Sequence, residues 1–251
     1  MNKSILKIAL PSILTNVTVP LLGLVDTAIV GHLGSAAYIG AIALGTPLMS
    51  MAYWGFGFLR MSTGGLTAQA VGEGSRERCF AILTRSLTWA LLIAAILLLL
   101  QVPLLNAVLY FAEGTKEVQA LAATYFRILI WGAPAVLCLS SINGWFIGMQ
   151  NATIPLIIAV VQNLINIAVS CFLVFGLNWT IEGVATGTLI AQYAGFALAA
   201  CLVWHFRPLP SCTTLRTAIG KSSLLDTTFL RMNRDIFLRT LCLLAVTSYF
   251  T

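Results

Sequence analysis

Charged side chains are scarce in this sequence. Only 9% of the 251 residues are Asp, Glu, Lys or Arg, whereas 59% are hydrophobic. A soluble globular domain carries about 25% charged residues. The composition therefore excludes an ordinary water-soluble domain and indicates an integral membrane protein.

Recognisable catalytic and metal-binding patterns are also missing. The six cysteines form no C-x-x-C pair, which argues against a zinc site or a disulfide framework. No H-E-x-x-H, G-x-S-x-G or Walker pattern occurs, and the two histidines, His32 and His205, are far apart in sequence. A membrane-embedded enzyme would need clustered acids or a histidine near the surface. We therefore expect no enzymatic activity, no metal and no cofactor.

The net charge of +6 does not indicate a nucleic-acid partner. The fourteen Lys and Arg residues are scattered singly and gather only in short connectors. This distribution is typical of charges that orient a membrane protein, because Lys and Arg are retained on the cytoplasmic side.

Long hydrophobic runs are abundant. About 20 apolar residues are enough to cross a bilayer as a helix, and six such runs occur near residues 8–33, 37–60, 86–108, 118–149, 153–175 and 181–205. A seventh begins after residue 229. The sequence predicts an all-α polytopic membrane protein with a six-helix lobe at 1–206, a cytoplasmic connector at 207–228 and the start of a second lobe at 229–251.

The connectors carry charge on alternate sides. Counted with the N-terminal segment, one side holds eleven basic residues: Lys3, Lys7, Arg76, Arg78, Arg85, Arg207, Arg216, Lys221, Arg231, Arg234 and Arg239. The other side holds only Lys116, and Arg60 is expected to reach the cytoplasmic surface from the end of the second span. The N-terminus is therefore predicted to be cytoplasmic.

Asp26 is the one acid within a predicted span. An acid at the centre of a membrane helix costs about 2.5–3.5 kcal/mol on insertion scales, and such groups are functional candidates by default. Asp26 lies 18 residues past Ile8, or about 27 Å along a helix, which places it in the outer half of the membrane. A buried carboxyl is more easily protonated, so Asp26 is a candidate proton carrier. A purely structural, hydrogen-bonded Asp remains the alternative.

Two other spans carry polar side chains at a similar depth. Asn163, Asn166 and Ser170 are spaced i, i+3 and i+7 on one face of the fifth span, and Thr188 lies seven residues inside the outer end of the sixth. These residues are candidates for a polar network or cation site around Asp26. The alternative is that they only hold helices together by hydrogen bonds, at about 0.6 kcal/mol each.

Two further features are candidates for motion and substrate binding. Pro11 removes a backbone hydrogen bond from the first span and permits a kink. In the second span Met49, Tyr53 and Phe56 could line a cavity for flat apolar cations. Packing in the core or against lipid is the alternative for these three.

Several segments, taken in order, resemble the N-terminal half of the multidrug and toxic compound extrusion (MATE) transporters, and most of all the DinF branch. They are ALPSILTNV, GLVDTAIVGHLGSAAYIGAIALG, FLRMSTGGLTAQAVGEG, YFRILIWGAPAV and FIGMQNATIPLIIAVVQNLINIAVSCFLVFGLNWTIEGVATGTLIAQ. The resemblance implies one six-helix lobe of a twelve-helix antiporter in a bacterial inner membrane. It also implies export of amphipathic or cationic compounds in exchange for H⁺ or Na⁺.

Carried over by position, the resemblance assigns the family's acid to Asp26, its bending proline to Pro11, its asparagine to Asn166 and its threonine to Thr188. Where relatives often have Asp one turn after the asparagine, this sequence has Ser170. That departure disfavours a sodium site, which needs several hard oxygen ligands including carboxylates. We therefore expect H⁺ as the coupling ion.

The expected partners are amphipathic small molecules, the lipid bilayer, and a missing second lobe or another copy of this chain. Two alternatives stay open at this point. One is an incomplete or structural half-transporter with no activity of its own, and the other is a flippase for lipid-linked substrates.

Overall fold

A computed structural model of the protein describes residues 13–14, 23–111, 115–206, 231–239 and 242. In chain order its elements are α2 (Ala36–Trp54), α3 (Phe58–Gly72), α4 (Arg76–Leu99), α5 (Gln101–Phe111), α6 (Lys116–Leu129), the 3₁₀ turn η1 (Ile130–Gly132), α7 (Ala133–Gly148), α8 (Thr153–Cys171), the π-helical turn η2 (Phe172–Gly176) and α9 (Ile181–His205). Residues 23–31 and 231–239 are also helical. The described residues contain no strand, so the all-α prediction is confirmed.

Four helical segments of the described residues are long and apolar enough to cross a membrane: Arg76–Leu99, Lys116–Gly148, Thr153–Gly176 and Ile181–His205. The last three agree with the predicted fourth, fifth and sixth spans. Large apolar side chains on α4, including Leu92, Ile96 and Leu99, are exposed at the surface. In a membrane this surface contacts lipid.

The third span begins earlier than predicted, at Arg76 rather than near residue 86. Ser75 caps the helix, because its side chain accepts a hydrogen bond from the backbone N–H of Arg78 at 3.4 Å. Arg85, which the sequence assigned to a connector, is buried within α4 with 8% exposure. The prediction for Arg85 was wrong, although ten basic residues still remain on the predicted cytoplasmic side.

The second span is two helices rather than one. The helix is interrupted by a turn at residues 55–57, and the segment rich in Gly, Ser and Thr that follows forms α3. Arg60 is therefore not at the end of the span but 12 residues before the end of α3, about 18 Å away along the helix. The expectation that Arg60 lies at the surface end of its span was wrong.

Glycine residues of α7 allow α3 to pack closely against it. A Cβ placed on Gly144 of α7 would lie 2.4 Å from the Arg60 carbonyl oxygen, and one on Gly148 would lie 2.5 Å from the Gly64 carbonyl oxygen. Only glycine permits this approach of two backbones, which is the usual way that membrane helices pack closely.

A chain of hydroxyl groups joins the same helices to α4. The Thr63 and Ser86 hydroxyls are 2.6 Å apart, and Ser86 donates to Ser141 at 2.9 Å. Ser141 donates to the carbonyl of Leu137, four residues earlier in its own helix, and Thr63, which has one hydrogen, can donate either to Ser86 or to the carbonyl of Leu59. The three hydroxyl residues are fully buried, and each has a partner. We call Thr63, Ser86 and Ser141 the hydroxyl chain.

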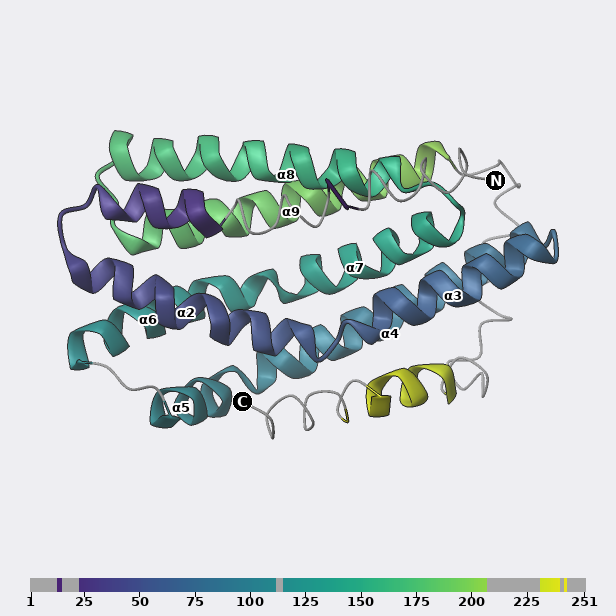
Figure 1. The fold of residues 1–251 in the computed structure, drawn as a ribbon, viewed down its shortest axis with the longest axis horizontal. Coiled ribbons are helices and arrows are strands. Elements are labelled where there is room, and N and C mark those ends of the chain that lie inside the picture. The colour runs from purple at the N-terminus through teal and green to yellow at the C-terminus, as the bar shows by residue number, and fades with distance from the viewer. Residues whose placement is uncertain (1–12, 15–22, 112–114, 207–230, 240–241, 243–251) are drawn as a thin grey trace.

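The helices form an elongated bundle whose long elements run along its longest axis (Figure 1). α8 packs on α9, α9 packs on α7, and α7 packs on both α3 and α4. α6 and α7 continue each other through η1 and also contact α9. α9 therefore lies between the helices that carry the predicted site residues.

Pro11 and residues 207–228 lie outside the described residues, as does half of the first span. The helix-one kink and the three-part division of the chain therefore stay predictions.

Candidate functional site

Asp26 is buried inside the lobe, with 5% of its surface exposed. It lies in the helical segment 23–31, next to the buried apolar side chains of Ile29 and Val30. Within the part of the chain that the structure describes, no Lys, Arg or His forms an ion pair with it, and its Oδ1 atom has no hydrogen-bond partner. The acid is thus held in an apolar environment without a counter-charge from these residues.

Thr188 of α9 connects Asp26 to the fifth span. Its side chain interacts with the Asp26 carboxyl, and its Oγ1 accepts a 2.8 Å hydrogen bond from Nδ2 of Asn166 on α8. The same Oγ1 is 2.9 Å from the Val184 carbonyl, to which it can donate. The helical segment 23–31 and the helices α8 and α9 therefore bring Asp26, Asn166 and Thr188 together.

Ser170 lies one turn beyond Asn166 on α8 and is fully buried. A Cβ on Gly187 of α9 would lie 2.2 Å from the Ser170 Oγ, so glycine is required where the two helices meet. Neither the Ser170 Oγ nor the Asn166 Oδ1 has a hydrogen-bond partner among the described residues. With Asp26 Oδ1, this gives three buried oxygens that have no hydrogen-bond partner among the described residues. We call Asp26, Asn166, Ser170 and Thr188 the acid cluster.

Asn163 lies one turn before Asn166 on α8 and is only half-buried. The gradient of burial along this face runs from Asn163 to the fully buried Asn166 and Ser170. Asn163 is thus on the expected face but toward its edge.

Sequence reasoning missed Tyr125. This residue of α6 is 3% exposed, its side chain interacts with Thr46, and it lies close enough to Asp26 to interact electrostatically. A Cβ on Gly45 would lie 2.6 Å from its ring, so α2 and α6 pack tightly around the tyrosine. The available signal was a hydroxyl on the apolar face of an amphipathic helix, which needs a polar partner when buried.

The fourth span is one helical segment, as predicted, but a 3₁₀ turn that the sequence did not predict interrupts its α-helix. The 3₁₀ turn η1 separates α6 from α7, and Pro134 follows without a backbone N–H to donate. Two tyrosines cover the interruption: Tyr53 donates to the Leu129 carbonyl at 3.2 Å, and Tyr193 donates to the Trp131 carbonyl at 2.8 Å. Interrupted helices mark binding sites in many transporters.

The three candidate cavity residues differ in burial: Met49 and Tyr53 lie in α2, and Phe56 lies in the turn that follows it. Met49 is 5% exposed and packs in the hydrophobic core with Phe126 and Ile130. Tyr53 and Phe56 are half-buried, and the Tyr53 side chain lies close enough to Tyr193 to interact with it. Of the three, Tyr53 and Phe56 therefore retain surface that a ligand could contact.

Comparison with known proteins agrees with this arrangement. The family model for MatE matches residues 11–172. The DNA damage-inducible protein F of Escherichia coli strain K12 is 38% identical over 244 residues, covering 96% of this chain and 52% of that protein. A protein of Synechocystis named "Probable multidrug resistance protein NorM" is 27% identical over 214 residues, covering 82% of this chain and 45% of that protein.

Among solved structures, a transporter of the MOP superfamily from Pyrococcus furiosus superposes with a TM-score of 0.77 at 19% identity, over 95% of this chain and 52% of that one. That likeness shows a common fold. The chain spans about half the length of the curated relatives it matches. On the match of the family model and the identity to its relatives, the chain belongs to the MatE family.

Proposed function

We propose that this chain is one lobe of a secondary active antiporter that exports amphipathic or cationic compounds in exchange for protons. The lobe acts in a bacterial inner membrane with its N-terminus in the cytoplasm. Asp26 carries the coupling proton, and Asn166, Thr188 and Ser170 surround it. Relatives that are named for multidrug resistance support export of drugs.

The observation that carries the proposal is the shortage of donors in the acid cluster. Three buried oxygens, on Asp26, Asn166 and Ser170, have no partner among the described residues. An unsatisfied buried acceptor costs about 1–3 kcal/mol. A proton on Asp26 converts an acceptor into a donor and so relieves this shortage. The cluster is therefore built to be more favourable when Asp26 is protonated.

Protonation can be coupled to movement through Thr188. In the charged state the Asp26 carboxylate competes with the Val184 carbonyl for the Thr188 hydroxyl hydrogen, while Asn166 donates to the oxygen of the same hydroxyl. When Asp26 becomes neutral, it no longer needs that hydroxyl and can donate elsewhere. We propose that the segment carrying Asp26 then shifts against α9, with Pro11 as its bending point, and that this shift displaces bound substrate.

Protons are favoured over sodium because the cluster contains one carboxylate. Sodium prefers several hard oxygen ligands with negative charge among them. Ser170 and Thr188 supply neutral hydroxyls, and Asn166 supplies an amide oxygen. Asp26 is thus the single charge that a coupling ion could neutralise in this cluster.

The substrate surface is proposed to lie beside the interruption in the fourth span. The half-buried rings of Tyr53 and Phe56 can stack on a flat apolar cation. A second lobe would form the opposite wall, because the chain spans about half the length of its relatives.

The test is ethidium export by everted membrane vesicles from cells that produce this chain together with the part of the Escherichia coli relative that it does not match. We expect export driven by a proton gradient, and a loss of at least about tenfold for Asp26→Asn. The matched control is Glu182→Gln, which neutralises an exposed acid at the start of α9. It should leave export unchanged.

Two outcomes would contradict the proposal. Unchanged proton-driven export by Asp26→Asn would remove Asp26 from the coupling step. Export that follows a sodium gradient, with no response to a proton gradient, would replace the proton by sodium. Vesicles that hold this chain alone should not export ethidium unless two copies of the chain form the complete transporter. Cross-linking of the chain in the same vesicles would reveal such a pair.

A further inference from the structure

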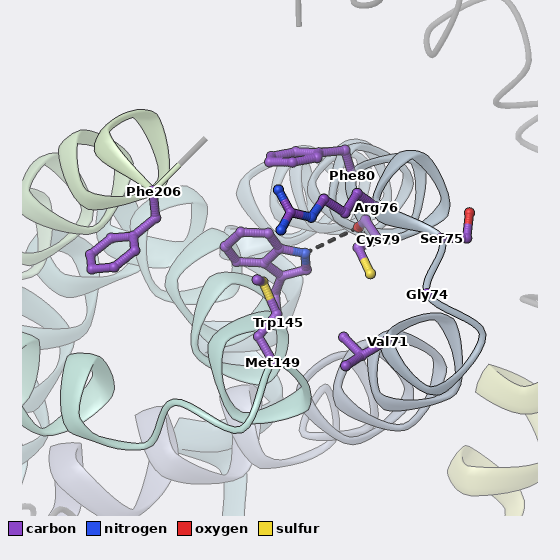
Figure 2. Close-up of a pocket in the computed structure, with 9 residues that line it drawn as sticks. All are labelled: Val71, Gly74, Ser75, Arg76, Cys79, Phe80, Trp145, Met149 and Phe206. Carbon is purple, nitrogen blue, oxygen red and sulfur yellow. Dashed lines mark hydrogen bonds between the residues drawn. The ribbon is translucent and has the colours of Figure 1, made fainter. Parts of the chain in front are cut away.

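A cavity of about 370 Å³ lies at the end of the lobe that is opposite to the acid cluster. Its walls come from the turn between α3 and α4, the end of α7 and the end of α9, and the residues around it are Val71, Gly74, Ser75, Arg76, Cys79, Phe80, Trp145, Met149 and Phe206 (Figure 2). α4 begins here, whereas α7 and α9 end here. The cavity is therefore at the membrane surface rather than in its middle.

The walls are aromatic and rigid. Trp145 is fully buried, and its indole N–H donates to the Cys79 carbonyl at 3.1 Å, which fixes the plane of the ring. The Phe80 ring lies 5.4 Å from the Trp145 ring, measured between centroids. Phe206, at the end of α9, closes another side of the cavity. Such walls favour an apolar or aromatic group and do not collapse onto one another.

The mouth of the cavity carries a positive charge. The Arg76 guanidinium is directed toward the face of Trp145 (Figure 2). The neighbouring Arg78 forms an ion pair with Glu73, whereas Arg76 has no ion pair with an acid of the described residues. Arg76 is also the first residue of the 24-residue helix α4, whose N-terminal end adds partial positive charge. The cavity thus combines one available cation with an apolar interior.

An anionic phospholipid fits this combination. At the membrane surface, lipids present a phosphate and an acyl chain side by side, and basic pockets between membrane helices bind anionic headgroups. The exposed apolar side chains of α4, including Leu91 and Leu92, border the lipid phase further along the same helix. A lipid can therefore place its phosphate on Arg76 while its chain follows α4.

We propose that this cavity binds one anionic phospholipid, with the phosphate on Arg76 and the upper part of an acyl chain between Phe80, Trp145 and Phe206. The lipid links the α3–α4 turn to the ends of α7 and α9. It thereby fixes the surface end of the helices that the hydroxyl chain holds together deeper in the lobe. The site is independent of Asp26 and of the export proposal.

The test is native mass spectrometry of the 251-residue chain, purified in a mild detergent, stripped of lipid and titrated with phosphatidylglycerol or phosphatidylcholine. We expect one phosphatidylglycerol to bind in preference to phosphatidylcholine. Arg76→Ala should weaken that first binding event about tenfold, because it removes a charge-assisted hydrogen bond. Arg78→Ala is the matched control, since it removes an arginine from the same turn that is already paired with Glu73.

A second variant tests the contribution of the cavity interior to lipid binding separately from that of Arg76. Val71→Trp keeps Arg76 but fills part of the cavity, and it should also weaken binding of phosphatidylglycerol. Circular dichroism of each variant confirms that its helices are intact. The proposal is overturned if Arg76→Ala and Arg78→Ala behave alike, or if the two lipids bind equally. It is also overturned if inorganic phosphate alone binds as tightly as phosphatidylglycerol, which would indicate a site for free anions.

Discussion

Two sets of buried polar side chains in this lobe, the hydroxyl chain and the acid cluster, differ in how many of their polar atoms have a hydrogen-bond partner. In the hydroxyl chain, Thr63, Ser86 and Ser141 each have a partner, and the chain ends on backbone carbonyls. In the acid cluster, Asp26, Asn166 and Ser170 each keep a buried oxygen without a partner among the described residues. A satisfied network stabilises a fold, whereas an unsatisfied one costs stability. We propose that the hydroxyl chain holds helices together, whereas the acid cluster serves the coupling step; other buried atoms without a partner among the described residues, such as Thr67 Oγ1 and Asn143 Oδ1, lie outside the acid cluster.

The largest loss of stability is expected from a substitution at the helix contact beside the hydroxyl chain. Gly144→Leu would place a side chain where even a Cβ lies 2.4 Å from the Arg60 carbonyl oxygen. Overpacking of this kind costs about 1–3 kcal/mol. We expect a clear fall in the thermal unfolding temperature of the purified chain. Gly72→Leu is the control, because a Cβ at Gly72 meets nothing within 4 Å, and a similar fall for both variants would refute close packing.

Asn166→Ala should act on function more than on stability. It removes the donor to Thr188 and one unpartnered oxygen of the acid cluster. Hydrogen bonds between membrane helices are worth about 0.6 kcal/mol on average, so the unfolding temperature should change little. Export of ethidium by the vesicles described above should fall about tenfold, equivalent to about 1.4 kcal/mol. Full export by a stable Asn166→Ala variant would remove Asn166 from the mechanism.

Ser86→Ala should show the reverse pattern. Ser86 is the middle member of the hydroxyl chain, and its loss leaves the Thr63 and Ser141 hydroxyls with one partner fewer. A loss of about 1 kcal/mol of stability is expected, measured as a lower unfolding temperature. Export per folded molecule should be unchanged. A variant that folds normally but does not export would show that the hydroxyl chain has a functional role.

Ser170→Ala is the matched serine and should have the smallest effect on stability. The Ser170 hydroxyl has no partner among the described residues, and replacing an unsatisfied buried group by an apolar one is nearly neutral or stabilising. The unfolding temperature should stay the same or rise slightly. Export should fall by less than it does for Asp26→Asn. A destabilisation as large as that of Ser86→Ala would mean that Ser170 is also a structural residue.

Depth along the helices was enough to predict which spans contribute to the acid cluster. Counting residues placed Ser170 and Thr188 near the level of Asp26, with Asn166 one turn from Ser170 on the same face. The structure brings the side chains of Asp26, Thr188 and Asn166 together. Depth could not identify Tyr125, because it does not say which helix lies next to Asp26. That neighbour is decided by the packing of α6 against α2, where Gly45 makes room for the ring.

The interruptions of the second and fourth spans could not be predicted from apolar character. A helix in a membrane loses its backbone hydrogen bonds only where other groups replace them. At η1 those groups are the hydroxyls of Tyr53 and Tyr193, which are 76 and 62 residues away from the carbonyls they bind. For the same reason Arg85 looked like a connector residue. Its burial depends on the close contact of α4 with α3 and α7.

The central claim is that Asp26 carries the coupling proton, and proton release on substrate binding tests it most directly. Ethidium is added to the purified transporter in weakly buffered solution, and released protons are counted with a pH-sensitive dye. The account predicts about one proton per bound ethidium for the protein with Asp26, and none for Asp26→Asn. Equal proton release by Asp26→Asn, with ethidium still bound, would contradict it.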